Sequence, residues 1–363
     1  MSFSKILLSQ SAFLHNAKVI STIKGKKKII FPVKSNAYGH GLRQVVKMSH
    51  DIVDMYMTAT LEEAIEIKRI APFKDVFIDL PLLEGEELKE AIERGFIFNI
   101  VTACQLRLLS GLPYNLRRKA RLQVEFDTGM NRTGFKHNDI NLLNDFFLDH
   151  PEIKVEGVFT HYATGIEDKE ALNKQYDIFK DILSKIRFYY ASVHSENSAA
   201  LLTFNFEDMH YVRPGITLYG MKPSPSYNID LLPVLSWKSV VIDVKDVKKG
   251  EGVSYGPTFI AQRDMKIATV PVGYGDGYPR NLSNKGYVII RDKRVKIIGT
   301  ICMNHFMVDV SGIDNVKVGD EVVVIGNAKD ESISAEEIAA LSGTINYEIT
   351  TRISPFLPRI VEK

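Results

Sequence analysis

The sequence predicts an α/β protein in which a (β/α)8 barrel is followed by a mainly β domain. Short β-rich runs alternate with amphipathic helical patterns over about 215 residues, the size and rhythm of such a barrel. The composition changes near residue 225, and the remainder is filled by strand-like runs with one helix candidate. A chain of 363 residues accommodates one large and one smaller domain.

Eight apolar, β-rich runs mark the strands of the predicted barrel. Between them, residues 61–70, 84–95 and 168–188 carry apolar side chains at i, i+3 and i+4, which is typical of helices that bury one face. An open doubly wound sheet is the alternative, but no GxGxxG follows the first run. The eight runs are residues 28–33, 54–59, 75–80, 96–101, 121–126, 155–160, 189–193 and 209–213.

A domain boundary is expected at MKPSPSYN (221–228), a segment rich in Pro and Ser. We therefore assign residues 1–228 to the barrel, apart from a few initial residues that can pack with the β domain. Residues 229–363 form the predicted β domain. Its helix candidate, 334–343, opens with a Ser cap and closes at Gly. Its strand-like runs are residues 237–247, 265–273, 286–303, 306–310 and 320–326.

Composition excludes several classes of protein. Lys and Arg total 46 against 44 acidic residues, so a basic face for nucleic acid is not expected. No run of eighteen apolar residues predicts a membrane span, and the N-terminal segment does not resemble a secretory signal. Cys104 and Cys302 belong to no CxxC pair, so neither a metal site nor a disulfide framework is predicted. We expect a cytoplasmic enzyme.

Catalytic side chains are expected where the strands end, because barrel active sites lie on that face. Lys34 ends the first run, in FPVKSNAYGHG. An amine partly removed from water there has a lowered pKa and can form a Schiff base. Taken alone, a lysine in this position is more often an exposed loop residue.

The loops after the seventh and eighth runs, HSENSAA and RPGITLYG, lie where many barrels bind phosphate. Ser198 is expected to cap the following helix. Gly215 lets the backbone approach an anion, with its own amide and that of Ile216 as donors. Each feature alone is common, and Arg213 and His161 could equally form a buried structural pair. A lysine facing a phosphate cradle nevertheless predicts pyridoxal phosphate.

The segment FPVKSNAYGHG closely resembles the cofactor-lysine segment of alanine racemases. The resemblance spans nearly the whole chain in the family's order. It implies a pyridoxal-phosphate-binding barrel, a β domain that completes the partner's active site in a homodimer, and supply of D-alanine for peptidoglycan. The further matching segments are DTGMNRTGF, FTHYAT, ENSAAL, VRPGITLYG, VSYGPTF, GYGDGYPR, GTICMNHFMVDV and YEITTRIS.

Two bases are implied by the resemblance. Lys34 would carry the cofactor and act on the D face, and Tyr255 of VSYGPT would act on the L face from the partner subunit. Inverting a stereocentre needs such groups on opposite sides. Tyrosine is a poor base without nearby positive charge, and the resemblance places His161 near it and against Arg213. Arg213 would donate to the pyridine nitrogen without protonating it, which limits side reactions. Without its motif, Tyr255 would be read as a core residue.

Further binding roles are implied in the same way. Arg132 and the amide of Met303 match the binders of the substrate carboxylate, and a planar guanidinium suits that task. Tyr278, in GDGYPR, matches an entrance position. Tyr347, Tyr255 and Met303 would crowd the side-chain pocket and favour alanine. The contacts to the cofactor, other than those of the lysine, would come from Tyr38, His161, Asn197, Ser198, Arg213, Gly215, Ile216 and Tyr347.

The chain departs from the family pattern at four positions. Many relatives have a lysine, often carbamylated, where this chain has Glu125, which already carries the negative charge that orients the arginine. Asn304 replaces an aspartate, Thr300 an arginine, and Phe356 lies where RVPR is usual. These changes leave a racemase of broader specificity, acting on lysine, arginine or serine, as an alternative.

Two other readings are weaker. A decarboxylase of the same plan would show a glycine triplet and a Cys–Asp pair, and neither is found. A non-catalytic cofactor carrier of the single-domain type would lack the β domain.

Overall fold

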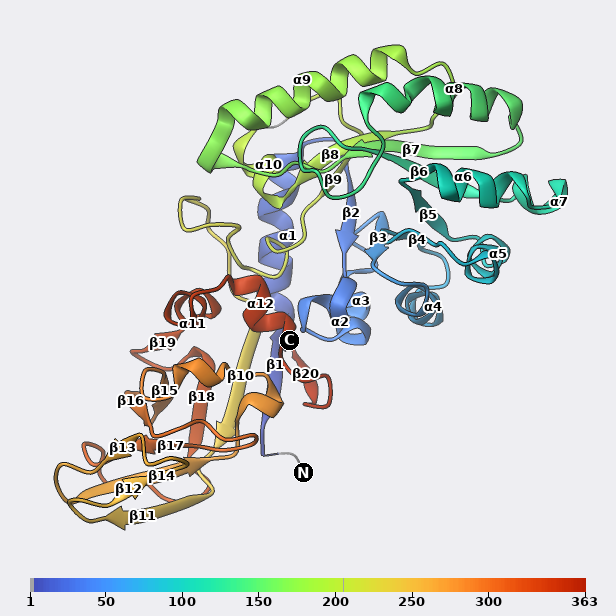
Figure 1. The fold of residues 1–363 in the computed structure, drawn as a ribbon. Helices are drawn as coiled ribbons and strands as arrows, with labels where there is room; N and C mark the ends of the chain where they lie inside the picture. Colours follow the sequence, from blue (N-terminus) through green and yellow to red (C-terminus); the bar gives the residue numbers. More distant parts are fainter. Residues whose placement is uncertain (1–2, 205) are drawn as a thin grey trace.

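The computed structural model describes residues 3–204 and 206–363, and eight parallel strands in it close into a barrel (Figure 1). Closure comes from the pairing of the first and last strands, with Lys28 opposite Tyr211 and Ile29 opposite Val212. The barrel prediction is therefore confirmed, and the open-sheet alternative is excluded. The strands are β2 (Lys28–Pro32), β3 (Met55–Thr58), β4 (Asp75–Ile78), β5 (Ile97–Ile100), β6 (Arg121–Phe126), β7 (Lys154–Thr160), β8 (Val193–Asn197) and β9 (Tyr211–Arg213).

The helices around the barrel are amphipathic. In α4 (Leu61–Ile70) the Thr60 hydroxyl accepts the amide of Glu63, and the helix buries Leu61, Ala64 and Ile67. Burying one such aliphatic side chain contributes about 1.5–3 kcal/mol. The other helices of this half are α1 (Gln10–Lys24), α2 (Lys34–Tyr38), α3 (Leu42–Ser49), α5 (Gly85–Glu93), α6 (Ala103–Ser110), α7 (Tyr114–Arg117), α8 (Ile140–Asp149), α9 (Lys169–Lys185) and α10 (Ser198–Thr203).

The seventh barrel strand, β8, lies later in the chain than the predicted run 189–193. Strand β8 begins at Val193 and continues through His194, Ser195 and Glu196, all of which are fully buried. Buried polar side chains on a strand leave no apolar pattern to read. The prediction was wrong here because the strand faces polar partners inside the barrel.

The C-terminal half is a large, mainly antiparallel sheet, and the initial strand β1 (Lys5–Ser9) belongs to it, between β10 (Leu235–Val240) and β20 (Arg359–Glu362). Side chains of β10 alternate between buried and half-buried, as on a sheet covered on one face. The remaining elements of this half are β11 (Asp243–Val247), β12 (Gly252–Val253), β13 (Phe259–Ile260), β14 (Met265–Val270), β15 (Tyr287–Ile290), β16 (Lys293–Ile298), β17 (Phe306–Asp309), β18 (Glu321–Asn327), β19 (Ser332–Ile333), α11 (Ala335–Ser342) and α12 (Asn346–Thr351).

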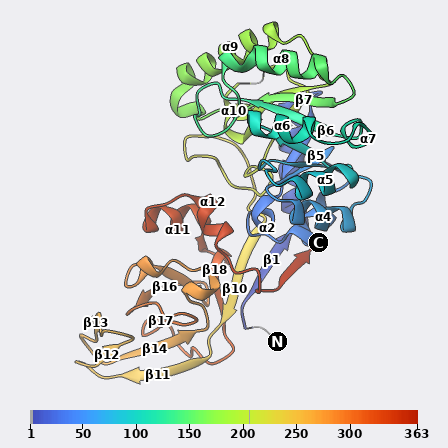
Figure 2. The same ribbon diagram turned by 45° about the vertical axis from the view of Figure 1, so that its right-hand side comes forward.

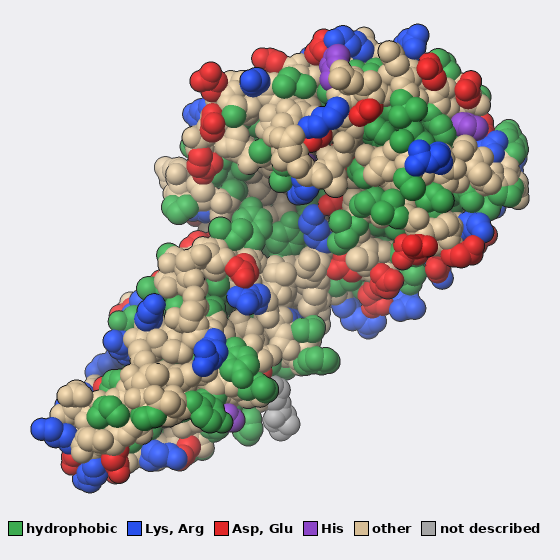
Figure 3. All heavy atoms as spheres, viewed as in Figure 1, with side chains coloured by type: hydrophobic (Ala, Val, Ile, Leu, Met, Phe, Trp, Pro, Cys, Tyr) green, Lys and Arg blue, Asp and Glu red, His purple; other side chains and the backbone are tan. Residues whose placement is uncertain are grey.

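The two halves form two lobes, and β2 points toward α2 and the C-terminal lobe (Figures 1 and 2). The carboxyl ends of the barrel strands therefore face the junction of the lobes. Figure 3 shows the surface recess between the lobes, where basic and hydrophobic side chains gather. In residues 3–204 and 206–363, no helix combines the length and apolar character needed to cross a membrane.

Candidate active site

Lys34 begins a left-handed turn directly after β2. Ser35, Asn36, Ala37 and Tyr38 all have φ of 54° or 55°, a region that costs L-residues about 1–2 kcal/mol each. Hydrogen bonds between backbone groups hold the turn closed. One of them runs from the amide of Ala37 to the carbonyl of Val33 at 2.8 Å. Strain of this kind persists only where the surroundings enforce it, and it clusters at functional sites. The turn fixes the position of Lys34 at the mouth of the barrel.

The amine of Lys34 donates to Asp79 Oδ2 at 2.9 Å. Burial lowers the pKa of Lys34, but the charge of Asp79 and its hydrogen bond to the amine oppose this effect and leave the pKa above its ordinary value. The predicted lowering of this pKa was therefore wrong for the protein without cofactor. The sequence pattern shows the burial of a strand-end lysine but not the carboxylate that a neighbouring strand places beside it.

A series of buried hydrogen bonds connects Asp79, after β4, with Asn99 on β5 and Glu125 on β6. The Asn99 amide, on β5, donates to the backbone carbonyl of Asp79 at 3.0 Å and to Glu125 Oε2 at 2.9 Å. Glu125, on β6, also accepts from the Thr133 hydroxyl at 3.0 Å. Burial, and secondarily the charge of Asp79, raise the pKa of Glu125. The Glu125 carboxyl group thus contacts the loop that carries Arg132.

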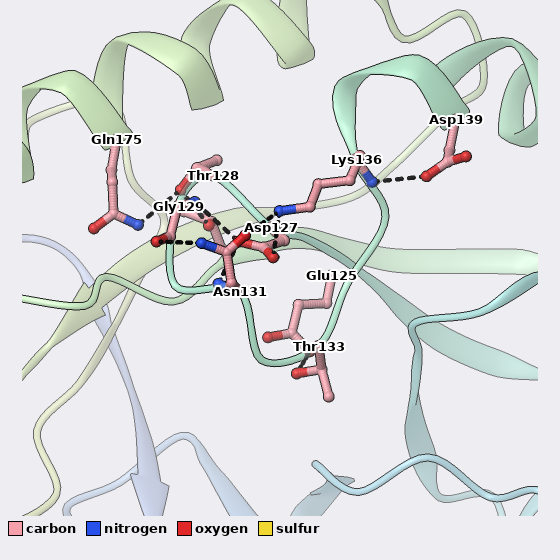
Figure 4. Close-up of polar contacts among 10 residues, drawn as sticks. Glu125, Asp127, Thr128, Gly129, Asn131, Thr133, Lys136, Asp139 and Gln175 are labelled. Atoms are coloured by element: carbon pink, nitrogen blue, oxygen red, sulfur yellow. Dashed lines mark hydrogen bonds and ion pairs between the residues drawn. The ribbon is translucent and has the colours of Figure 1, made fainter.

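Arg132 lies in the loop that follows β6, between two residues whose contacts are drawn in Figure 4. Asp127 organises this loop: its Oδ1 accepts the amides of Gly129 and Asn131 at 2.9 and 3.0 Å, and its Oδ2 pairs with Lys136 at 2.7 Å. The Arg132 side chain itself is exposed. The loop therefore presents a guanidinium at the mouth from a rigid support.

Arg213 ends β9 with its guanidinium buried. Its Nη2 donates to the carbonyls of Thr160 and Ser195 at 2.8 and 2.9 Å and lies 3.5 Å from His161 Nδ1, while its Nη1 contacts His194. Burial lowers the pKa of Arg213 to about 10, so it stays cationic at neutral pH. Among the described residues nothing accepts from Nε, so this N–H is available to a ligand. The expected Arg213–His161 pairing is present, with His194 as an additional partner.

Hydroxyl groups gather beside Gly215. A Cβ at Gly215 would lie 3.0 Å from the Tyr38 hydroxyl, and the ring of Tyr347 lies 6.1 Å from that of Tyr38 between centroids. Ser198 Oγ is 3.2 Å from Thr217 Oγ1. Tyr38, Tyr347 and Gly215 therefore lie together, and Ser198 lies beside Thr217, two residues after Gly215.

Two details of the predicted phosphate loop were wrong. The cap of α10 is Asn197, whose Oδ1 accepts the amide of Ala200 at 2.9 Å, and Ser198 is the first helical residue. The amide of Gly215 donates to the carbonyl of Arg213 at 2.9 Å, so it is not free to bind an anion. The tight turn after β9 bends the backbone onto itself, which a sequence motif does not show. Asn197 also contacts the carbonyl of Tyr162 at 3.2 Å and lies 3.5 Å from His161.

Neither Tyr255 nor Met303 belongs to the barrel. Both belong to the C-terminal lobe, where their side chains are 73% and 58% exposed. In both ribbon views β12, which precedes Tyr255, is at the far end of this lobe from α2 (Figures 1 and 2). One chain therefore does not bring Lys34 and Tyr255 together.

Tyr278 does not lie at an entrance. It is buried in the C-terminal core, with its ring 5.4 Å from that of Phe306. The exposed tyrosine of GYGDGY is Tyr274, whose amide donates to the carbonyl of Cys302. Two tyrosines four residues apart cannot be distinguished by composition alone, so this assignment was wrong.

Several site residues have no counterpart in the sequence prediction. Asp79 directly follows β4, and this strand-end position could have singled it out, whereas Asn99 lies within β5. His194 and Thr217 are fully buried polar residues next to predicted site residues, and nothing in the sequence distinguishes them.

Comparison with known proteins identifies the family. The profile "Alanine racemase, N-terminal domain" matches residues 8–223, and "Alanine racemase, C-terminal domain" matches residues 234–361. The alanine racemase of Halothermothrix orenii is 39% identical over 96% of this chain and 94% of its own length. Alanine racemase 2 of Caldanaerobacter subterraneus is 36% identical over 98% and 94%.

Solved structures agree. The alanine racemase of Streptomyces lavendulae superposes with a TM-score of 0.91 at 30% identity, covering 100% of this chain and 98% of that one. That of Bacillus anthracis with bound L-Ala-P gives 0.91 at 31% identity, covering 100% and 96%. The chain belongs to the alanine racemase family.

Proposed function

We propose that this chain interconverts L- and D-alanine with pyridoxal 5'-phosphate held at the mouth of the barrel. One observation carries the proposal: the Lys34 amine, fixed by a strained turn, shares the mouth with a buried arginine and a set of hydroxyl groups. An amine, a cationic donor and a hydroxyl cradle are the groups that an aldehyde, a pyridine nitrogen and a phosphate require.

The donor set fits the cofactor. Nε of Arg213 and the hydroxyls of Tyr38 and Tyr347 have no hydrogen-bond partner among the described residues. Because Gly215 has no side chain, its backbone lies close to the Tyr38 hydroxyl, where a Cβ would be only 3.0 Å away. Lys34 would hold the carbonyl carbon, Arg213 the pyridine nitrogen, and Tyr38, Ser198, Ile216 and Tyr347 the phosphate, with His161, Asn197 and Gly215 around them.

Racemisation then needs a proton transfer on each face of the substrate. Bound pyridoxal phosphate supplies an electron sink for the pair left at Cα. The Lys34 amine takes or returns a proton on one face, and the Tyr255 phenol does so on the other. Arg132 and the amide of Met303 would bind the substrate carboxylate. The carboxylate of Glu125 would orient the Arg132 guanidinium.

A homodimer is part of the proposal. Tyr255 and Met303 are exposed on a lobe that points away from its own Lys34. A second copy, with its residues 229–363 seated against the barrel of the first, 1–228, would bring both residues to the mouth. The proposed cellular use is supply of D-alanine for peptidoglycan in the cytoplasm.

The alternative of broader specificity rests on Asn304. Its amide contacts Asp276 at 3.3 Å within the C-terminal lobe. The test is racemisation of L-alanine, L-serine, L-lysine and L-arginine by purified, cofactor-loaded protein, followed by chiral chromatography. We expect alanine to turn over fastest. Equal or faster turnover of lysine or serine would move the enzyme to the broader class, and decarboxylation products would reject a racemase.

A further inference from the structure

Asp79, the residue directly after β4, lies at the reactive amine. Its side chain is 10% exposed, and Lys34 Nζ, at 2.9 Å, is the one hydrogen-bond partner of its carboxylate among the described residues. A carboxylate with so little contact with water must be paired to remain charged. The pair therefore couples the orientation of the amine to that of Asp79.

We propose that Asp79 is a positioning residue for the reaction: its carboxylate aims the Lys34 amine and stabilises the ammonium that forms when this amine takes the Cα proton. The inference rests on the proposed function, in which Lys34 is the base on one face.

Both partners are held by rigid supports. The amide of Asp79 donates to the carbonyl of Thr58 at 2.8 Å, and its carbonyl accepts from Asn99, which is itself fully buried. On the other side, the left-handed turn fixes the backbone of Lys34. Exposed ion pairs contribute little because ordering two free side chains offsets the attraction. Here the backbone of both residues is held in place and the Asp79 side chain is short, so only the Lys34 side chain must be ordered for the carboxylate to direct the amine.

The proton step balances without a change of charge on Asp79. The Cα–H bond breaks, its electron pair stays with the substrate, and an N–H bond forms at Lys34, which becomes an ammonium. Asp79 accepts a hydrogen bond from that ammonium and keeps its own negative charge. In the reverse direction the ammonium returns the proton to Cα.

The groups around Lys34 have opposite effects on the pKa of its amine. Burial and the charge of Arg132 lower the pKa of Lys34, whereas the charge and the hydrogen bond of Asp79 raise it, and the raising effects prevail. A conjugate acid of higher pKa belongs to a stronger base, so removing Asp79 weakens the base. Only the face served by Lys34 should be affected, because Tyr255 serves the other.

The first test compares deuterium isotope effects in Asp79→Asn holoenzyme. With D-alanine deuterated at Cα, whose proton Lys34 removes, we expect a larger isotope effect on kcat than in the unchanged protein, and about tenfold slower turnover. With deuterated L-alanine the isotope effect should stay the same. Asp79→Glu, which keeps the charge but displaces it, should give an intermediate result and serves if the Asn variant does not fold.

The second test needs no turnover. Capture of pyridoxal phosphate by apoprotein at pH 8 depends on the fraction of Lys34 that is unprotonated. Because Asp79 raises the pKa of Lys34, Asp79→Asn should leave more of the amine unprotonated and capture the cofactor faster, while racemising more slowly. The matched control is Asp75→Asn at the other end of β4, where the carboxylate pairs with Arg121 at 2.8 Å, far from the mouth. It should leave capture and isotope effects unchanged.

The outcomes distinguish the role of Asp79 from that of Lys34. Slower turnover with faster capture supports the positioning role. Slower turnover without faster capture than in the unchanged protein would overturn that role, and so would no change in either rate. Both results would leave Lys34 as the base. Capture of cofactor at the usual rate by Lys34→Ala would instead reject the proposed function itself.

Discussion

Arg213 and His194 are hydrogen-bonded inside the barrel, where β9 and β8 run side by side. The other ring nitrogen of His194 lies 2.5 Å from Gln123 Oε1. Burial, and then the charge of Arg213, hold the pKa of His194 well below its ordinary value, so the ring is neutral. A neutral ring can share the arginine's N–H without adding a second buried charge.

Replacing His194 with alanine should therefore destabilise the protein. The change leaves an N–H of a buried guanidinium without its partner and opens a cavity, each of which costs about 1–3 kcal/mol. We expect a lower midpoint of thermal unfolding and weaker cofactor binding. His50→Ala, at a half-exposed histidine, is the control and should leave both unchanged.

Glu125→Gln should make the protein more stable and less active. The folded protein raises the pKa of Glu125 above its ordinary value of 4.5, so it binds this proton more tightly than the unfolded chain does. The stability of the unchanged protein therefore falls as pH rises from about 4.5 through the raised pKa. Urea unfolding should show the variant to be more stable above this range and equal below it.

The activity of Glu125→Gln tests the orientation of Arg132. A neutral amide cannot balance the guanidinium, so we expect KM for alanine to rise about tenfold, with a smaller change in kcat. An unchanged KM would show that Arg132 needs no negative group below it.

Gly215→Ala should weaken cofactor binding. The added methyl would lie 3.0 Å from the Tyr38 hydroxyl, in the space assigned to the phosphate. We expect the dissociation constant of pyridoxal phosphate, measured by equilibrium dialysis, to rise at least about tenfold, or 1.4 kcal/mol. Gly312→Ala, where a methyl meets nothing within 4 Å, is the matched control. Equal affinities in the two variants would place the phosphate elsewhere.

Subunit mixing tests whether Tyr255 acts across a dimer. Lys34→Ala and Tyr255→Phe should each be inactive alone. If the tyrosine comes from the partner, unfolding and refolding an equal mixture should restore about a quarter of full activity, because half the dimers then contain one intact site. If both residues acted within one chain, mixing would restore nothing.

The barrel could be predicted from sequence because most of its strands follow the usual pattern. Strands β2 to β7 are apolar runs, and helix α4 has the predicted bounds because its cap and apolar spacing agree. Strand β8 could not be placed correctly, because His194, Ser195 and Glu196 are buried polar residues whose partners come from other strands.

The candidate site divides in the same way. Residues in motifs, such as Lys34 and Arg213, could be singled out in advance. The left-handed turn and the Lys34–Asp79 contact could not, because the first depends on backbone strain and the second on residues 45 positions apart. Neither leaves a local signal in the sequence.

The central claim is that Lys34 carries the cofactor. Borohydride reduction of the cofactor-loaded protein, followed by peptide mass spectrometry, would fix the pyridoxyl group to the lysine that holds it. We predict a single modified peptide that contains Lys34, and no modified peptide from Lys34→Ala. A pyridoxyl group on another lysine in the unchanged protein, with Lys34 unmodified, would contradict the account.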